Sequence, residues 1–294
     1  MNAVAPSRFR ASWARAWRAT SLDRRSLPAI PGLAFLLLFF AAPILFMILR
    51  SVTDPSPSNY LVMASSSVYW RVLLTTLRTG VTVTLVCLLL GYPYAYAMHR
   101  IGGTGTQLLA ALVILPFWSS LLVRTYAWTV LLQDTGVINS ILLRLAVIHQ
   151  PIQLMRNTLG VTIGMVHILL PFMVLPLYAV MHRVDDELLR AASGLGAVPR
   201  VVFRRVFLPL TMPGVLAGSL LVFVLSVGFY ITPALLGSPR DMMFSELIYI
   251  QVTQLLNFGV GSALATSLLV LILVIVWLGS RRVSVRDVFG AGVD

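Results

Sequence analysis

The stretch from residue 185 to residue 218 reads DDELLRAASGLGAVPRVVFRRVFLPLTMPGVLAG, and it joins a charged segment to an apolar one without a break. Asp185 or Asp186 can cap a helix there, Gly196 stands where a left-handed residue would end it, and Pro199 fits the first position of a second helix. The apolar side chains of the first helix recur at i, i+3, i+4 and i+7, on one face; they are Leu188, Ala191, Ala192 and Leu195. The stretch therefore predicts a helix, a glycine turn and a second helix.

The apolar face of the first helix needs a cover. The protein's own underside, the lipid headgroups and a groove on a partner protein are all able to supply one. The spacing of the apolar residues leaves these three possibilities open.

The whole chain is far more apolar than a soluble domain of its length. Of its 294 residues, 58% are hydrophobic and only 11% are charged, and the mean hydropathy is +0.90. Apolar runs long enough to cross about 30 Å of hydrocarbon recur along it; they lie at 31–49, 79–98, 108–132, 158–181, 211–236 and 260–279. We therefore expect an all-α polytopic membrane protein with about six transmembrane helices.

The segments between these spans carry their own patterns. Residues 51–78 begin with the turn-rich DPSPSN and continue as an amphipathic stretch from Val68 to Leu77. A second helical stripe follows between Asp134 and Pro151, and its apolar side predicts a helix on the outer membrane interface. Both segments are expected on the external side.

The basic residues exclude several functions and orient the chain. All 22 of them are arginine, so the chain has neither the lysine of a nucleotide-binding P-loop nor one for a Schiff base. The net charge of +12 lies in tails and loops beside apolar spans, where membrane topology explains it without nucleic acid. Cys87 is the single cysteine, and the four histidines have no metal-site spacing.

Arginine distribution predicts the topology. With both termini in the cytoplasm, the inner segments hold 15 arginines and the outer loops 6. We therefore expect a cytosolic Arg-rich tail at 1–30, a transmembrane domain at 31–279 and a cytosolic C-terminal tail at 280–294. The loop at 182–208 is then also cytosolic.

The central stretch resembles a known signature. Ala191, Ala192 and Gly196, followed after nine residues by Val206-Phe207-Leu208-Pro209, resemble the EAA loop of permease subunits of bacterial ATP-binding-cassette importers. Arg190 stands where that family has its name-giving glutamate. Four further stretches are similar to permeases of spermidine/putrescine importers; they are GYPYAYAM (91–98), LPFWSSLLVRTYAW (115–128), GMVHILLPFMVLPLY (164–178) and LPLTMPGVLAG (208–218).

This resemblance implies a fold, a set of partners and a coupling site. The fold is that of a type I ABC importer permease (MetI-like) in the bacterial inner membrane. The partners are two copies of an ABC ATPase subunit that binds ATP and Mg, a second permease subunit that is a paralogue, and a periplasmic solute-binding protein. This chain itself has no cofactor. The residues implied in coupling to the ATPase subunit are Leu188, Arg190, Ala191, Ala192, Leu195, Gly196, Leu208 and Pro209.

A polyamine cargo, which the resemblance favours, needs aromatic faces and carboxylates along its path. The candidate pathway residues are Trp118, Tyr126, Trp128, Phe229, Tyr230, Asp134 and Glu246, with Asp241 also near the outer mouth. Helix packing or an interfacial belt is the alternative role for each aromatic residue. Arg124 lies in a span and would repel a cation, which predicts either a structural ion pair or an anionic cargo.

Three other functions remain as alternatives. One is an ABC permease for an opine, an amino-acid-like solute or an anion. Another is a secondary transporter without an ATPase partner, although such proteins carry intramembrane ionisable groups that are scarce here. A membrane enzyme is the third, but the sequence has no zinc-protease or nucleophile-elbow motif, and helix capping explains its acidic run at 185–187.

Overall fold

The computed structural model describes residues 30–54 and 56–280, and the regular secondary structure in them is helical. Of the two predicted cytosolic tails, 1–29 and 281–294 lie outside the described residues. The chain divides into two compact units, residues 1–50 and 51–294, each of which is considered by itself.

The first unit contains one apolar helical run. It consists of α2 (Ile30–Leu36), a π-helical turn η2 (Leu37–Ala41) and most of α3 (Ala42–Thr53). The run has no acidic residue and is long and apolar enough to cross a membrane from Pro31 to Thr53. The span expected at 31–49 is therefore confirmed and extended by four residues.

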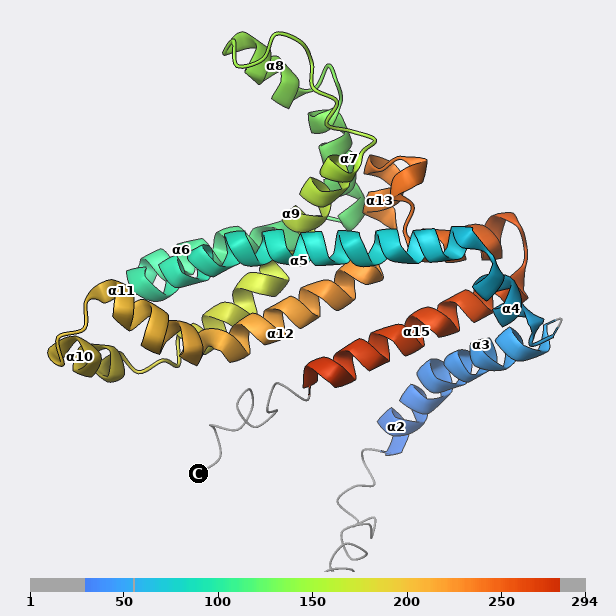
Figure 1. Ribbon diagram of the computed structural model, residues 1–294, viewed down its shortest axis with the longest axis horizontal. Coiled ribbons are helices and arrows are strands. Elements are labelled where there is room, and N and C mark those ends of the chain that lie inside the picture. Colours follow the sequence, from blue (N-terminus) through green and yellow to red (C-terminus); the bar gives the residue numbers. More distant parts are fainter. Residues whose placement is uncertain (1–29, 55, 281–294) are drawn as a thin grey trace, which may run out of the picture. The chain divides into compact units, whose positions relative to one another are not determined.

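The second unit contains the remaining helices, which Figure 1 shows with their labels. They are α4 (Ser58–Ser65), α5 (Ser67–Ile101), α6 (Gly103–Ile114), η3 (Leu115–Trp118), α7 (Leu121–Leu132), α8 (Val137–Arg144), α9 (Thr158–Met181), α10 (Asp186–Gly194), α11 (Pro199–Val202), η4 (Phe203–Phe207), α12 (Leu208–Val227), α13 (Ile231–Leu236), η5 (Pro239–Asp241), α14 (Phe244–Tyr249), η6 (Ile250–Gln254) and α15 (Phe258–Ser280).

Helices α5, α9 and α12 pack against one another and form the core of this unit (Figure 1). Methionine is frequent in that core, where its flexible side chain fills irregular gaps. The fully buried methionines include Met98, Met165, Met173 and Met181. A second cluster joins α15 to α14 and to the start of α5 through Val72, Phe244 and Leu264.

Met173 of α9 packs against a glycine on each of the other two core helices. A Cβ atom added at Gly91 of α5 would lie 2.9 Å from the Met173 Cγ atom, and one at Gly218 of α12 would lie 2.9 Å from its Sδ atom. Both glycines therefore let a neighbouring helix approach α9 more closely than any other residue would allow.

Two predicted spans are confirmed closely, at 158–181 (α9) and 260–279 (α15). The helix expected between Asp134 and Pro151 is also present, as α8. The total of five spans, or six if a bent helix pair counts as one, agrees with the expected number.

Three predicted boundaries were wrong. The amphipathic stretch from Val68 to Leu77 is not a separate element, because α5 runs unbroken from Ser67 to Ile101 and keeps Pro93 inside it. The span expected at 108–132 is broken at Ser119 and Ser120, where the chain bends by 98°. Such a break leaves non-helical backbone in an otherwise apolar segment, which periodicity does not reveal.

The third error concerns the span expected at 211–236. The helical run begins at Pro199 and ends at Val227, so the second helix of the central loop and the following span are one continuous element. A π-helical turn, η4, keeps that continuity: Leu208 N–H bonds to the Phe203 carbonyl, five residues back. Pro209 has no N–H to donate, and the wider turn accommodates this without ending the helix.

Candidate functional site

The loop between α9 and α12 folds as its sequence predicts. The Asp185 carboxylate accepts a hydrogen bond of 2.8 Å from the Glu187 backbone N–H, which caps α10. Pro199 begins α11 as its first residue. The helix, the glycine turn and the second helix are all confirmed.

Gly196 forms the turn between these two helices. Its φ of +87° lies in the left-handed region, which an L-residue with a side chain adopts only at a cost. Its N–H bonds to the Ser193 carbonyl at 3.0 Å, and the Ala197 N–H bonds to the Ala192 carbonyl at 3.2 Å. This pair of bonds is a Schellman motif, and it fixes the direction in which the chain leaves α10.

Helix α10 presents two different apolar faces. Leu189 packs inward against the core cluster. Leu188 is 52% exposed and Leu195 is 90% exposed, and Ala191 is exposed between them. Because no described residue covers this outer face, the protein's own underside is not its cover within the described part of the chain. A partner groove and the membrane surface remain as possible covers.

An aromatic cluster attaches the second loop helix to the end of α5. The ring centroids of Tyr96 and Phe203 lie 5.5 Å apart, those of Tyr96 and Phe207 lie 5.3 Å apart, and those of His99 and Phe207 lie 5.4 Å apart. Edge-to-face pairs such as the first two add to the hydrophobic contact itself. Nearby, the Tyr92 and Thr211 hydroxyls form a hydrogen bond of 2.9 Å.

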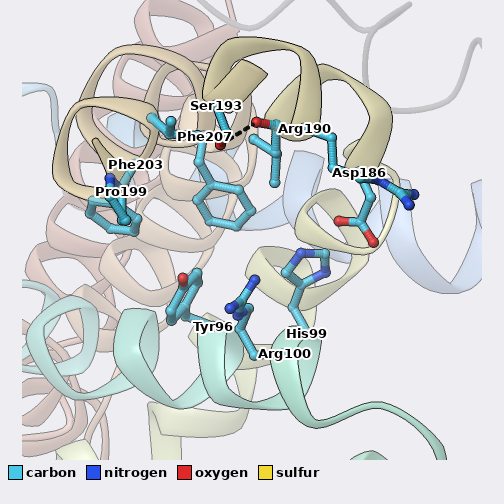
Figure 2. A pocket seen from close by; sticks show the side chains of 11 residues that line it. Tyr96, His99, Arg100, Asp186, Arg190, Ser193, Pro199, Phe203 and Phe207 are labelled. Carbon is cyan, nitrogen blue, oxygen red and sulfur yellow. Dashed lines mark hydrogen bonds between the residues drawn. The ribbon is translucent and has the colours of Figure 1, made fainter. Parts of the chain in front are cut away.

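A cavity of about 460 Å³ opens between α10, the second loop helix and the end of α5 (Figure 2). Its charged lining consists of Arg100 from α5 and of Asp186 and Arg190 from α10, and His99 lies beside them. Figure 2 shows Phe203 on the side of the cavity across from Asp186, and Arg100 between Tyr96 and His99. Helix α10 thus contacts the helical bundle through Leu189, while its charged residues Asp186 and Arg190 line the cavity.

Arg190, on α10, is one of the residues that line this cavity. It makes no ion pair with any described residue. The residue that stands in place of the family's glutamate thus contributes a positive charge beside the exposed apolar face of α10.

The candidate pathway residues do not form one group. Trp128 is a packing residue, because its Nε1–H donates to His167 Nδ1 at 3.1 Å and holds α7 against α9. Trp118 is 92% exposed at the broken span, and Tyr126 is 58% exposed on α7. Asp134 lines a separate cavity of about 350 Å³ with Arg156 and Gln153. Phe229 packs against the main core.

Tyr230 and Glu246 do come together, and Tyr249 joins them. The Tyr230 and Tyr249 rings stack with their centroids 4.8 Å apart. Burial, the neighbouring Tyr249 and the charge of Glu246 raise the pKa of Tyr230. Burial also raises the pKa of Glu246, which a backbone hydrogen bond from Met243 only partly offsets. Two stacked rings beside one carboxylate suit an organic cation. Tyr249 was missed because its apolar neighbours in sequence gave no signal.

Asp241 lies in a network of hydrogen bonds inside the chain. It is buried, and its carboxylate accepts hydrogen bonds from the hydroxyls of Thr158 and Ser238 and, at 3.0 Å, from the Ser238 backbone N–H. Burial alone would raise its pKa, but these hydrogen bonds lower it below the ordinary range. The Asp241 carboxylate, which the sequence placed near the outer mouth, is thus occupied by hydrogen bonds within the chain.

The ion pair considered for Arg124 is absent from the described part of the chain. The Nε and Nη1 atoms of its guanidinium are buried and have no hydrogen-bond partner there. No described carboxylate pairs with it.

Known proteins resemble this chain in sequence and in fold. Residues 25–290 match the family model described as "Binding-protein-dependent transport system inner membrane component". The spermidine/putrescine transport system permease protein PotB of Escherichia coli (strain K12) is 38% identical over 216 residues, which cover 72% of this chain and 78% of that one. The inner membrane ABC transporter permease protein YdcU of the same organism is 34% identical over 231 residues, 74% of this chain and 70% of that one.

Solved structures agree on the fold. A chain of a bacterial alginate ABC transporter, in complex with its alginate pentasaccharide-bound periplasmic protein, superposes with a TM-score of 0.73 at 18% identity, covering 95% of this chain and 99% of that one. A chain of the MetNI methionine ABC transporter gives 0.56 at 16% identity, covering 76% of this chain and 99% of that one. The predicted type I importer fold and the predicted resemblance are both confirmed. This chain belongs to the family of binding-protein-dependent transport system inner membrane components, and it is a multi-pass permease of the ABC importer class.

Proposed function

We propose that this chain is the transmembrane permease subunit of an importer that carries a polyamine such as spermidine or putrescine. An external binding protein delivers the cargo, and a separate ATPase subunit, present in two copies, binds ATP and Mg and supplies the energy. A second, paralogous permease subunit completes the pathway. The similarity to spermidine/putrescine permeases over 72% of the chain supports the cargo class.

The observation that carries the coupling proposal is the outer face of α10. Leu195 is 90% exposed at the end of a helix whose exit is fixed by Gly196. An apolar side chain so exposed and so firmly oriented suits a helix-in-groove contact on the ATPase. Leu188, Ala191 and Ala192 complete this docking face. It faces the cytoplasm if the arginine-rich segments lie inside, with both termini cytoplasmic.

A displacement of α10 by the ATPase has a continuous helical path to the membrane span. Residues 199–227 form one helical run, so a displacement at Pro199 reaches the span without crossing a flexible joint. Phe203 and Phe207 transmit part of it to α5 through their contacts with Tyr96. Leu208 and Pro209 follow the π-helical turn, which keeps the helix continuous past Pro209 and so sets the angle between the loop helix and the span.

On the cargo side, Tyr230, Tyr249 and Glu246 are the residues best suited to receive a cation. Tyrosine rings attract an ammonium group through their faces, and the same ammonium group would pair with the negative charge of the Glu246 carboxylate. Exposed Trp118 and Tyr126 stay candidates for the pathway, whereas Trp128 acts in packing.

Coexpression with the genomic neighbours tests the proposal. An ATPase with a Walker motif and a second permease should copurify with this chain. Proteoliposomes containing the complex and the binding protein should take up labelled spermidine only when ATP is inside. Uptake by the solitary chain, driven by an ion gradient, would identify a secondary transporter instead.

A further inference from the structure

The cavity between α10, the second loop helix and the end of α5 lies where an apolar segment ends. The apolar run at 79–98 of α5 stops at Met98, and the next two residues, His99 and Arg100, both line the cavity. Because about 20 apolar residues already cross the ~30 Å of hydrocarbon, the polar residues that follow them lie at the level of the lipid headgroups. The lining of the cavity therefore includes side chains at headgroup depth.

Charged side chains of both signs line this cavity without pairing. Arg100 comes from α5, whereas Asp186 and Arg190 come from α10. None of the three forms an ion pair with another residue in the part of the chain that the structure describes. All three are exposed, so a ligand that enters the cavity from outside is able to reach them.

The rest of the lining is largely aromatic. Figure 2 shows Phe203 across the cavity from Asp186, and Tyr96 beside Arg100. Phe207 is only 2% exposed, so it forms a fixed part of this wall. Charged groups beside an apolar wall suit an amphipathic ligand, and the volume of about 460 Å³ is in the usual range for small-molecule sites.

The two signs of charge restrict the kind of ligand. A purely anionic group would pair with Arg100 and Arg190 but would be repelled by Asp186, and a purely cationic group would have the reverse problem. A phosphate and an ammonium group on one molecule give each charge a partner. Guanidinium N–H groups bind two phosphate oxygens at once, and a carboxylate accepts hydrogen bonds from an ammonium group.

We propose that this cavity binds the headgroup of a phospholipid that carries a primary ammonium group, as phosphatidylethanolamine does. Its phosphate accepts hydrogen bonds from Arg100 and Arg190, its ammonium group donates to Asp186, and the aromatic wall contacts its glycerol and first acyl carbons. The bound lipid joins α10 to the end of α5 and so holds the coupling loop at one distance from the bundle. The proposal goes beyond the transport function and depends on no particular cargo.

The lipid and a docked ATPase use different faces of α10. Leu188 and Leu195 belong to the exposed outer face. The residues that line the cavity recur at i, i+3, i+4 and i+7 on the other side of the helix; they are Asp186, Leu189, Arg190 and Ser193. Occupation of the cavity therefore leaves the docking face free.

Thermal unfolding of the full chain in nanodiscs of defined lipid tests the selectivity. Adding phosphatidylethanolamine to phosphatidylcholine discs should raise the melting temperature by about 3 °C or more, because choline has no N–H to donate. The same fraction of phosphatidylglycerol should raise it less. Asp186→Asn should lose the shift. Glu187→Gln removes an equal charge from the same turn of α10 without lining the cavity, and it should keep the shift. Both variants should melt alike in pure phosphatidylcholine, which shows that the fold is intact.

Photocrosslinking locates the lipid. Phosphatidylethanolamine with a photoreactive group at the start of an acyl chain should label the segments that line the cavity, and Arg100→Gln should reduce that labelling about tenfold. Arg200→Gln changes an exposed arginine outside the cavity and should leave the labelling unchanged. The proposal is overturned if Asp186→Asn keeps the shift, because the shift is then a property of the bilayer, or if Arg100→Gln is labelled normally. It is equally overturned if phosphatidylglycerol stabilises the chain as well, or if free phosphoethanolamine gives the same shift without the lipid.

Discussion

The Tyr92 and Thr211 hydroxyls lie 2.9 Å apart, and this hydrogen bond joins α5 to α12 across 119 residues of sequence. It lies in the core beside the aromatic cluster that attaches the second loop helix to α5. Thr211 is fully buried. The pair therefore links the first turn of α12, just after the loop at 182–208, to α5.

Removing either hydroxyl should weaken that link. Tyr92→Phe and Thr211→Val should each lower the unfolding free energy, and a double-mutant cycle should give a coupling of about 0.5–1.5 kcal/mol, as for hydrogen bonds between membrane helices. Unfolding in mixed micelles measures it. Tyr126→Phe is the control, since the Tyr126 hydroxyl has no partner among the described residues. Additive effects would show that the hydroxyls do not interact.

Gly196 should tolerate no side chain, for conformational reasons alone. A Cβ atom there would meet nothing within 4 Å, but the φ of +87° makes Gly196→Ala cost about 1–2 kcal/mol at the end of α10. Gly194→Ala, two residues earlier and helical, should be neutral or slightly stabilising. Gly196→Asp should leave membrane insertion intact and uncouple ATP hydrolysis from uptake in proteoliposomes. Normal uptake by that variant would count against docking through α10.

Leu195 and Leu189 should respond differently to the same substitution. Leu195→Glu should reduce copurification of the ATPase about tenfold and leave the melting temperature of the chain unchanged, because 90% of the side chain is exposed in the free chain. Leu189→Glu should lower the melting temperature, because Leu189 packs against the core. If Leu195→Glu instead lowered stability and preserved binding, the outer face would not be the docking face.

Asp241 should make stability depend on acid pH. Its folded-state pKa is lowered, so its contribution is complete above the ordinary pKa of 3.8 and is lost as the pH falls through the lower folded value. Asp241→Asn should remove about 2 kcal/mol at neutral pH, since amide N–H groups replace an acceptor between donors, and should flatten the acid dependence. Thermal unfolding from pH 7 to pH 3 measures both effects. An unchanged acid limb in the variant would exclude this carboxylate as its source.

The contribution of Glu246 to stability should depend on pH in the opposite direction to that of Asp241. Its folded-state pKa is raised, so its contribution is complete below the ordinary pKa of 4.5 and is lost as the pH rises through the folded value. Glu246→Gln should therefore stabilise the empty protein slightly at neutral pH and reduce spermidine uptake about tenfold. Full uptake by Glu246→Gln would remove Glu246 from the pathway.

Local rules determined the loop at 185–218 from its sequence. Asp185, Gly196 and Pro199 each act on backbone groups within a few residues, so their roles as cap, turn and helix start are readable without the fold. The spans at 158–181 and 260–279 were equally readable, because an apolar run of that length has few alternatives to crossing the membrane.

Only the tertiary structure determined which side chains are exposed or lack a partner within the chain. Leu189 and Leu195 look alike in sequence, yet one packs into the core and the other is 90% exposed. Asp241 and Glu246 are both acidic residues near an expected outer mouth, but hydrogen bonds from Thr158 and Ser238 occupy the first and the tyrosine pair adjoins the second. Composition alone determines that the chain is a membrane protein, because the free energy of transfer from water to lipid is summed over the residues of each span. Whether a given side chain is free to bind a ligand or partner depends instead on which residues from distant segments pack against it.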